Sequence, residues 1–416
     1  MDCRLCGADE VPQILDLGRL ALTGIFPKSH NDEVPVGPLQ LVRCESCGLV
    51  QLAHNYYLPT LYGETYGYRS GLNHSMVLHL ASKVQQILNR VQLQPGDLVI
   101  DIGSNDGTLL NSYPQMGLRR VGVDPTGEKF RRYYQKGIEL IPEFFSAGAV
   151  RVVAGHQKAK AITSIAMFYD LEHPFEFVSD LIEVLDDNGI WMFEQSYLPL
   201  MIKSNGYDTI CHEHLEYYTL HQIRYIARKM GLKIIDVELS QVNGGSFCVT
   251  VAKQGAVYPE ETELVDSILS RECAGGFDSA KPFVQFSLVV HKHRRDLRDL
   301  LTAIRSRGET VLGYGASTKG NVLLQYCGID ETLLPAIAEV NEDKFGSFTP
   351  GTRIPIISEL EARERNPDYL LVLPWHFRDG IVLKESLYLE SGGKLIFPLP
   401  EVEIVSAPRE ARPSSA

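Results

Sequence analysis

The sequence predicts an α/β protein with a parallel-sheet domain at its centre, a small cysteine-rich domain before it and a second α/β domain after it. Three observations support this prediction: two C-x-x-C pairs near the N-terminus, a strand, glycine turn and helix pattern from residue 97, and a second such pattern from residue 310. A chain of 416 residues is expected to form two or three domains. We place them at residues 1–60, 61–255 and 256–416.

Composition narrows the class of protein. Apolar residues make up 44% of the chain and charged residues 22%, which is typical of a folded globular protein. The 40 basic and 52 acidic side chains give a net charge of −12, so we expect no binding to nucleic acids or to anionic membranes. The N-terminus carries no apolar leader, and no apolar stretch is long enough to cross a bilayer. These features predict a soluble, cytoplasmic protein.

Two cysteine pairs, Cys3 with Cys6 and Cys44 with Cys47, have the spacing that lets each pair bind one tetrahedral Zn²⁺. Without a secretion signal, a metal site is favoured over a disulfide. Four sulfur ligands leave no open coordination position, so we expect a structural zinc ion. The alternative is four reduced cysteines without a metal. Short strands are expected at residues 13–17, 39–42 and 49–52.

Five tyrosines follow the cysteine-rich domain, at positions 56, 57, 62, 66 and 68. An aromatic seam between domains is the simpler interpretation. Tyrosine hydroxyls can also contact a polar ligand, and the residues alone leave both interpretations open.

A strand and a glycine turn begin the central sheet. Residues 97–102 are mostly apolar, Gly103 and Gly107 allow a tight turn into a helix, and Asp124 ends the next apolar run, where it can accept from ribose hydroxyls. The motif from Asp101 to Gly107 is D-x-G-x-x-x-G rather than the three-glycine motif that seats a pyrophosphate. This favours S-adenosylmethionine (SAM), which has no phosphate, over a nicotinamide cofactor or a core without a ligand.

The alternation of elements continues through the central domain. Strands are expected at residues 161–168 and 189–194, with an amphipathic helix at 174–185 between them. This βαβ order predicts a parallel sheet.

A cluster of titratable residues, His212, Glu213 and His214, precedes a helix expected to begin near Thr219. H-x-H without a third ligand at a set spacing is weak evidence for a metal site. Two imidazoles around a carboxylate suit proton transfer at neutral pH. A polar loop that caps the following helix is the alternative.

The C-terminal third repeats the strand and glycine-turn pattern. A helical stretch over residues 260–307 leads into a strand at 310–314 and a glycine turn at 315–321. The backbone N–H groups of this turn, with Lys319 nearby, are suited to bind phosphates. Further strands are expected at 335–340 and 369–373. A structural α/β domain without a ligand is the alternative.

Taken in order, these motifs resemble the sugar C-methyltransferases of deoxysugar biosynthesis. The resemblance rests on the two C-x-x-C pairs, Tyr-x-Tyr-x-Ser from Tyr66 to Ser70, the DIGSNDG turn and the segment from Asp208 to His214. It covers essentially the whole chain. It implies a class I SAM-methyltransferase domain of Rossmann-like fold, a preceding zinc-binding domain and a C-terminal Rossmann-like domain. It further implies a monomer that methylates a carbon next to the keto group of a nucleotide-linked sugar, typically dTDP-linked.

The resemblance also assigns roles by motif position. His214 would remove the alpha proton, and Glu213 would orient or polarise His214. Tyr66 and Tyr68 would line the sugar and stabilise the enolate. SAM would contact Asp101, Gly103, Asn105, Gly107, Asp124 and Pro125. The nucleotide sugar would contact Cys211, His212, Tyr314, Lys319, Asn321, Trp375 and His376.

Two positions depart from the family pattern. Cys211 stands where some relatives carry tyrosine, and Asp170 occupies or neighbours the place of a loop histidine. The substrate, the methylated carbon or the acceptor atom could therefore differ. Methylation of an oxygen or nitrogen atom, and a non-catalytic zinc-containing binding protein, are the alternative functions.

Overall fold

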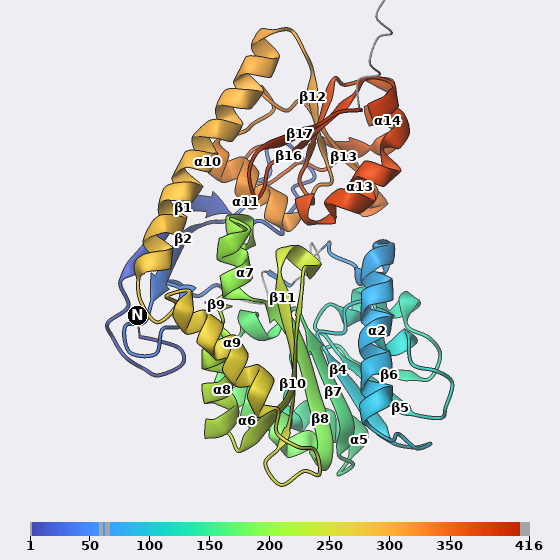
Figure 1. The fold of residues 1–416 in the computed structure, drawn as a ribbon. Coiled ribbons are helices and arrows are strands. Elements are labelled where there is room, and N and C mark those ends of the chain that lie inside the picture. The colour runs from blue at the N-terminus through green and yellow to red at the C-terminus, as the bar shows by residue number, and fades with distance from the viewer. Residues whose placement is uncertain (1, 58–60, 63–66, 408–416) are drawn as a thin grey trace, which may run out of the picture. The chain divides into compact units, whose positions relative to one another are not determined.

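The computed structural model describes residues 2–57, 61–62 and 67–407 (Figure 1). Residues cluster into two compact units, each built from three stretches of chain. The first unit comprises Met1–Asp16, Gln40–Met201 and His212–Val284, and the second comprises Leu17–Leu39, Ile202–Cys211 and Gln285–Ala416. The predicted three-domain boundaries stay a prediction. Within the described ranges, no helix is both long and apolar enough to cross a membrane.

A seven-stranded sheet forms the core of the first unit, in the order β10–β11–β8–β7–β4–β5–β6. All neighbours pair in parallel except β11, which runs antiparallel to both β8 and β10. The strands are β4 (Leu98–Ile102), β5 (Arg119–Val123), β6 (Ile138–Ile141), β7 (Ala159–Ile165), β8 (Leu185–Ser196), β10 (Leu232–Ser240) and β11 (Ser246–Lys253). This arrangement confirms the Rossmann-like fold predicted for the central domain.

Helices cover both faces of this sheet, because its buried strands are apolar on both sides. One face packs against α2 and α3, and the other against α5, α6, α8 and α9. Their bounds are α2 (His74–Arg90), α3 (Thr108–Asn111), α5 (Ala147–Ala154), α6 (Pro174–Val184), α8 (Leu220–Lys229) and α9 (Thr262–Ala274). Two short helices are α4 (Gly127–Phe130) and α7 (Leu198–Lys203), and the long helix α10 (Lys281–Ser306) follows α9.

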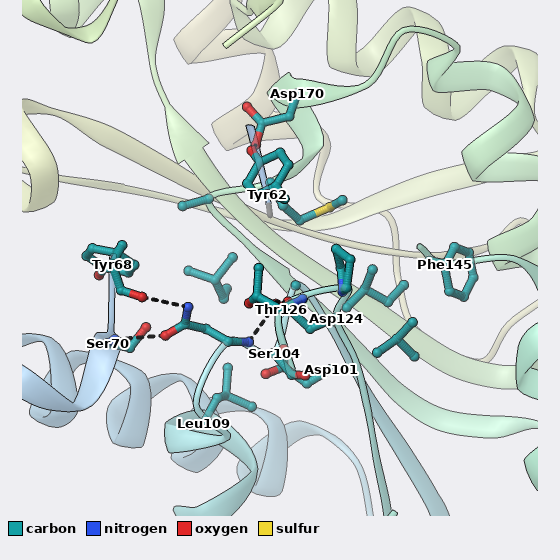
Figure 2. Close-up of a pocket in the computed structure, with 18 of the residues that line it drawn as sticks. Tyr62, Tyr68, Ser70, Asp101, Ser104, Leu109, Asp124, Thr126, Phe145 and Asp170 are labelled. Carbon is teal, nitrogen blue, oxygen red and sulfur yellow. Dashed lines mark hydrogen bonds between the residues drawn. The ribbon is translucent and has the colours of Figure 1, made fainter. Parts of the chain in front are cut away.

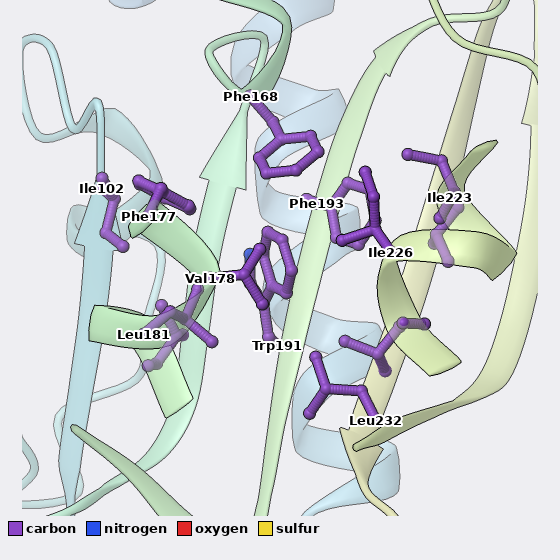
Figure 3. Packing of buried hydrophobic residues seen from close by; sticks show 14 of the residues in the cluster. Ile102, Phe168, Phe177, Val178, Leu181, Trp191, Phe193, Ile223, Ile226 and Leu232 are labelled. Atoms are coloured by element: carbon purple, nitrogen blue, oxygen red, sulfur yellow. The ribbon is translucent and has the colours of Figure 1, made fainter. Parts of the chain in front are cut away.

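An aromatic core fixes the turn that follows β7 (Figure 3). Phe168 is fully buried and lies 5.3 Å from the ring of Trp191 and 5.4 Å from that of Phe193, between α6 and α8. The strand expected to reach residue 168 ends at Ile165, because Ala166 adopts a positive φ of 55°. The residues after it, Phe168–Asp170, form a single 3-10 turn anchored by this core.

The cysteine-rich segment forms a four-stranded sheet in the order β1–β2–β3–β9. Its strands are β1 (Gln13–Ala21), β2 (Val36–Arg43), β3 (Val50–Leu52) and β9 (Glu216–Tyr217). The three strands predicted in this segment are confirmed, with β1 and β2 longer than expected. The fourth strand, β9, comes from a distant part of the sequence and directly follows the His212–His214 cluster.

A six-stranded sheet, β14–β13–β12–β15–β16–β17, forms the core of the second unit. Every pair is parallel except β16 with β17, and the order matches the 3-2-1-4-5-6 order of Rossmann folds. Its strands are β12 (Val311–Tyr314), β13 (Ile337–Glu339), β14 (Ile356–Ser358), β15 (Tyr369–Val372), β16 (Lys394–Phe397) and β17 (Glu403–Val405). The helices are α11 (Thr318–Cys327), α12 (Glu359–Glu364), α13 (Arg378–Lys384) and α14 (Ser386–Glu390). The predicted C-terminal Rossmann-like fold is confirmed.

Candidate active site

A pocket opens at the carboxyl ends of β4, β5 and β7 in the first unit. Parallel sheets bind ligands at this edge, where the turns after neighbouring strands meet. Figure 2 shows Asp101 and Leu109 on one side of this space and Tyr62 and Asp170 on the opposite side. Other residues that line it include Tyr68, Ser70, Gly103, Ser104, Asn105, Asp124, Pro125, Thr126, Phe145 and Met167.

The glycine turn after β4 is held in shape by Asp124, at the end of the neighbouring strand β5. Gly103 and Asn105 have positive φ values of 73° and 51°, and a Cβ on Gly103 would approach Met167 Cγ to 3.1 Å. The Asn105 N–H donates to Asp124 Oδ2 at 2.8 Å, and the N–H and hydroxyl of Thr126 donate to Asp124 Oδ1 at 2.7 and 2.6 Å. The Asp124 carboxylate is therefore fixed at the wall of the pocket.

Five of the six residues predicted to contact SAM line this pocket, namely Asp101, Gly103, Asn105, Asp124 and Pro125. The sixth, Gly107, caps α3 with a φ of 76°, and a Cβ there would lie 2.8 Å from the Tyr134 ring. Gly107 therefore shapes the turn by close packing. The roles of all six toward SAM stay predictions.

Asp101 gives the pocket its acidic floor. Its carboxylate is buried at the end of β4 and accepts from the Thr163 hydroxyl at 2.6 Å. Burial raises the pKa of Asp101 to about 7, and the nearby Asp124 adds to the shift. Two carboxylates and an apolar wall fit a ligand that carries positive charge and ribose hydroxyls, as SAM does.

The wall beside the glycine turn comes from the segment that precedes α2. Asn105 Nδ2 donates to the carbonyl of Tyr68 at 3.1 Å, and its Oδ1 accepts from the Ser70 N–H at 3.0 Å. These bonds bring Tyr68 to the pocket with its side chain half-exposed, and its role toward a sugar stays a prediction. Tyr66, the other predicted tyrosine, lies outside the described residues.

Asp170 and Tyr62 form a polar pair at the mouth of the pocket. The Tyr62 hydroxyl donates to Asp170 Oδ2 at 2.5 Å, while Asp170 Oδ1 is buried with no hydrogen-bond partner among the described residues. Burial raises the pKa of Asp170 well above its ordinary value, and the charge of nearby Glu213 raises it further. The buried Asp170 carboxyl is therefore harder to ionise than an exposed one, and in its protonated form it can donate a hydrogen bond.

The His212–His214 cluster lies against the turn that carries Asp170. The His214 ring is half-buried and its centroid lies 4.3 Å from that of Tyr169, and the Leu215 N–H donates to the Tyr169 carbonyl at 2.8 Å. Glu213 is buried and close enough to Asp170 to affect its pKa. His212 is fully buried and packs edge-on against Tyr56, at 4.8 Å between ring centroids. The structure thus brings Glu213 and His214 beside a pocket residue.

The four N-terminal cysteines form one cluster. The sulfur atoms of Cys3, Cys6, Cys44 and Cys47 lie within 4.8 Å of one another, and the pairs Cys3–Cys47 and Cys6–Cys44 are 3.5 Å apart. Tetrahedral Zn²⁺ with bonds of about 2.3 Å requires sulfur atoms roughly 3.8 Å apart. The four thiolates therefore fit one structural zinc ion.

Most of the predicted nucleotide contacts meet around Asp208 in the second unit. Trp375 Nε1 donates to Asp208 Oδ2 at 2.8 Å. Burial lowers the pKa of Lys319, while the charges of Asp208 and Cys211 oppose that shift. Burial, with a contribution from Lys319, lowers the pKa of His376 to about 3, so this imidazole is neutral at pH 7. Lys319, Trp375, His376 and Cys211 thus share one neighbourhood.

Two other predicted contacts already serve the fold. The Tyr314 hydroxyl donates to Glu385 Oε1 at 3.0 Å, and both groups are buried. Asn321 Nδ2 donates to the Thr23 carbonyl at 2.7 Å. The substrate contacts predicted for Tyr314 and Asn321 stay untested, but these polar atoms are held by other parts of the unit.

Sequence reasoning missed two residues that the structure places at these sites. Tyr62 was one of five tyrosines with no signal to separate it from the others, and Asp208 was noted only as part of a motif. An acidic residue three positions before Cys211, in a segment already assigned to the substrate, could have drawn attention to Asp208.

The Rossmann-like sheet, its acidic pocket and the four-cysteine cluster are the features expected of a SAM-dependent methyltransferase with a zinc-binding domain. Three family models match in the corresponding order: "Putative zinc binding domain" over residues 3–62, "Methyltransferase domain" over 73–237, and "C-methyltransferase C-terminal domain" over 241–400. The C-methyltransferase NovU of Streptomyces niveus is 32% identical over 409 residues, which cover 98% of this chain and 97% of that protein. The chain belongs to this C-methyltransferase family, as the order of its motifs predicts.

Two solved structures each match less than half of the chain. Magnesium protoporphyrin IX methyltransferase from Synechocystis, solved with bound S-adenosylhomocysteine, is 16% identical with a TM-score of 0.33, over 47% of this chain and 92% of that one. The cyclopropane synthase MmaA2 from Mycobacterium tuberculosis is 13% identical with a TM-score of 0.33, over 41% of this chain and 83% of that one. At these TM-scores neither match adds to the assignment.

Proposed function

We propose that this enzyme methylates the carbon next to the keto group of a nucleotide-linked deoxysugar, with dTDP as the nucleotide that the family resemblance implies. The observation that carries the proposal is that Glu213 lies close enough to Asp170, which lines the pocket, to affect its pKa, while His214 packs against the neighbouring Tyr169. A base, an acid and a cofactor pocket are what carbon methylation next to a ketone requires. The similarity to the C-methyltransferase NovU also supports transfer to carbon.

The proposed chemistry begins with the alpha proton of the keto-sugar. The His214 imidazole accepts this proton, and the electrons of the C–H bond form an enolate whose negative charge lies mainly on the former keto oxygen. Glu213 stabilises the resulting imidazolium. Asp170 in its protonated form and a tyrosine hydroxyl would donate hydrogen bonds to the enolate oxygen.

SAM supplies a methyl group bound to a positively charged sulfur. The alpha carbon would form a bond to that methyl carbon, and the electrons of the sulfur–carbon bond would return to sulfur. The role of the chain is to hold donor and acceptor in line and to exclude water, because proximity supplies much of the rate. Asp101 and Asp124 orient the donor from one wall, and Asp170 and Tyr68 face the acceptor from the other.

The nucleotide is assigned to the second unit. Lys319 follows the glycine turn after β12, at the first turn of the ten-residue helix α11, where backbone N–H groups attract anions. Trp375 and the neutral His376 offer an aromatic surface and a neutral donor or acceptor for a base or sugar. The second unit therefore provides positive charge for the diphosphate.

Exchange of the substrate proton tests the mechanism without methyl transfer. Candidate keto-sugar nucleotides, dTDP-linked sugars first, are incubated with the enzyme in D₂O without SAM, and deuterium at the alpha carbon is followed by NMR. We expect exchange with the wild type and a loss of about 100-fold or more with His214→Ala. His221→Ala, which changes an exposed histidine on α8, is the matched control and should exchange at the wild-type rate.

Two outcomes would change the assignment. If the enzyme methylates a sugar without exchanging its alpha proton, transfer is to oxygen or nitrogen. If calorimetry detects no binding of SAM or S-adenosylhomocysteine, the methyltransferase function itself is refuted.

A further inference from the structure

Arg4 lies between the zinc ligands Cys3 and Cys6 in the sequence, but its side chain reaches the backbone at Leu52 and Leu215. Its side chain is only 4% exposed. An arginine so deeply buried must have hydrogen-bond partners for its N–H groups, because an unpaired buried cation is costly. Those partners show what the residue does.

The Arg4 guanidinium holds two stretches of backbone together. Nη1 donates to the Leu52 carbonyl at 2.8 Å and reaches the Leu215 carbonyl at 3.4 Å. Nη2 donates to the His54 carbonyl at 3.2 Å and to the side chain of Asn55. Leu52 ends β3 and Leu215 directly follows His214, so one side chain bridges the cysteine-rich sheet and the segment with the proposed base.

The segment 212–217 is fixed by this sheet from several directions. The Leu52 N–H donates to the same Leu215 carbonyl at 2.8 Å. Glu216 and Tyr217 pair as β9 with Gln51 and Val50 of β3. Arg4 Nε also lies 4.0 Å from Glu216 Oε1, which gives this buried carboxylate a positive charge nearby.

The backbone of Arg4 is fixed in turn by the cysteine cluster. Cys3 and Cys6 flank it, and its N–H donates to Gln51 Oε1 at 3.0 Å. A second link runs from Gln222 Nε2, on α8, to the Cys47 carbonyl at 2.9 Å. Metal coordination at Cys3 and Cys6 would therefore set the position from which the guanidinium reaches Leu215.

We propose that Arg4 is a positioning residue that connects the zinc site to the loop carrying His214. The zinc-held turn fixes Arg4, Arg4 fixes the Leu215 carbonyl, and this contact sets the depth of the His214 imidazole beside the pocket. The zinc-binding domain thus acts in catalysis by placing the base, without contacting substrate. The catalytic part of this inference rests on the proposed role of His214, whereas the anchoring part does not.

The test compares Arg4→Met and Arg4→Lys with Arg43→Met. Arg43 is a matched control, because it also stands next to a zinc ligand in the sequence and its side chain is also 4% exposed. That side chain contacts Glu45 and the Phe283 ring. Zinc content is measured by metal analysis. Amide hydrogen exchange of the peptide 210–219 is measured by mass spectrometry on the full chain without substrate, so that loop order is read independently of activity.

We expect both Arg4 variants to keep one zinc per chain and to exchange amides 212–217 about tenfold faster or more than the wild type. Arg43→Met should exchange this peptide at the wild-type rate. Turnover should fall about 10- to 100-fold in kcat with little change in KM for SAM, because the base is misplaced while the cofactor pocket is intact. Arg4→Lys keeps the charge but has one nitrogen, so its effects should be intermediate.

Wild-type amide exchange in both Arg4 variants would overturn the proposal, whatever their activity. If Arg4→Met loses its zinc, the comparison rests on Arg4→Lys. Faster amide exchange with an unchanged rate of alpha-proton exchange would keep the anchor but refute its role in placing the base, whereas a wild-type rate of alpha-proton exchange in His214→Ala would refute His214 as the base. The two failures are therefore distinguishable.

Discussion

The two Rossmann-like sheets each have a glycine turn after their first strand, but the charged side chains around the two turns differ. Near the turn after β4 lie the buried carboxylates of Asp101, Asp106 and Asp124. The turn after β12 has Lys319 on the following helix, and Lys344 donates to the Ala316 carbonyl at 2.8 Å. The same backbone pattern is thus combined with acidic groups in one unit and with lysines in the other.

The acidic residue at the tip of the second strand also differs between the units. Asp124 lines the pocket. Glu339, at the end of β13, accepts from the N–H groups of Ala316, Val340 and Asn341 and lies 3.8 Å from Lys344. The fold alone therefore does not determine which ligand binds. The side chains that each unit places on this shared fold determine it. A cationic cofactor suits the first turn and an anionic diphosphate suits the second.

The largest effect is expected at Asp124. Asp124→Ala removes the proposed acceptor for ribose hydroxyls and the acceptor that holds Asn105 and Thr126, so SAM affinity measured by calorimetry should fall about 100-fold. Glu339→Ala is the equivalent change in the second unit and should alter SAM affinity less than about twofold. Equal losses in the two variants would mean that the turns do not differ in the way proposed.

A smaller effect is expected at Lys319. Lys319→Met removes the proposed partner of the diphosphate, and the affinity for dTDP should fall about 10- to 30-fold while SAM affinity stays unchanged. The wild-type affinity for dTDP should also weaken with added salt more than that of the variant. The control is Lys394→Met, which removes a lysine of β16 that pairs with Glu309. Unchanged dTDP affinity in Lys319→Met would remove the diphosphate from this turn.

The pH dependence of SAM binding tests the acidic turn. Asp101 has a pKa of about 7 because of its burial, so it is largely protonated at pH 6 and largely ionised at pH 8. A cationic ligand favours the ionised form, and SAM affinity should therefore rise about eightfold between pH 6 and pH 7.5, with release of a proton. Asp101→Asn cannot ionise and should show a flat profile over this range. A flat profile in the wild type would exclude Asp101 as the titrating group.

The sequence was sufficient to predict those features that depend on a few neighbouring residues. The spacing of Cys3 to Cys6 and Cys44 to Cys47 predicted the thiol cluster, and the two strand and glycine-turn patterns predicted both Rossmann-like sheets. Each of these signals needs only a few neighbouring residues, because turns and metal-binding knuckles are set by short-range backbone geometry.

The contacts that complete the sites join distant positions. Tyr62 meets Asp170 across 108 residues, Trp375 meets Asp208 across 167, and Arg4 meets Leu215 across 211. No periodicity links such pairs, since tertiary packing decides them. The same holds for β9, two residues that join a sheet more than 160 positions earlier in the chain, as the pairing of Val50 with Tyr217 shows.

The smallest effect is expected at Tyr314, where the sequence predicted a substrate contact. Because its buried hydroxyl donates to Glu385, which also pairs with Arg363, Tyr314→Phe should lower the free energy of unfolding by about 1 kcal/mol and leave dTDP affinity within about twofold of the wild type. Chemical denaturation and calorimetry measure these two effects separately. A loss of dTDP affinity comparable to that of Lys319→Met would show that the hydroxyl leaves Glu385 for the substrate, and it would extend the anionic-ligand site from α11 back to the end of β12.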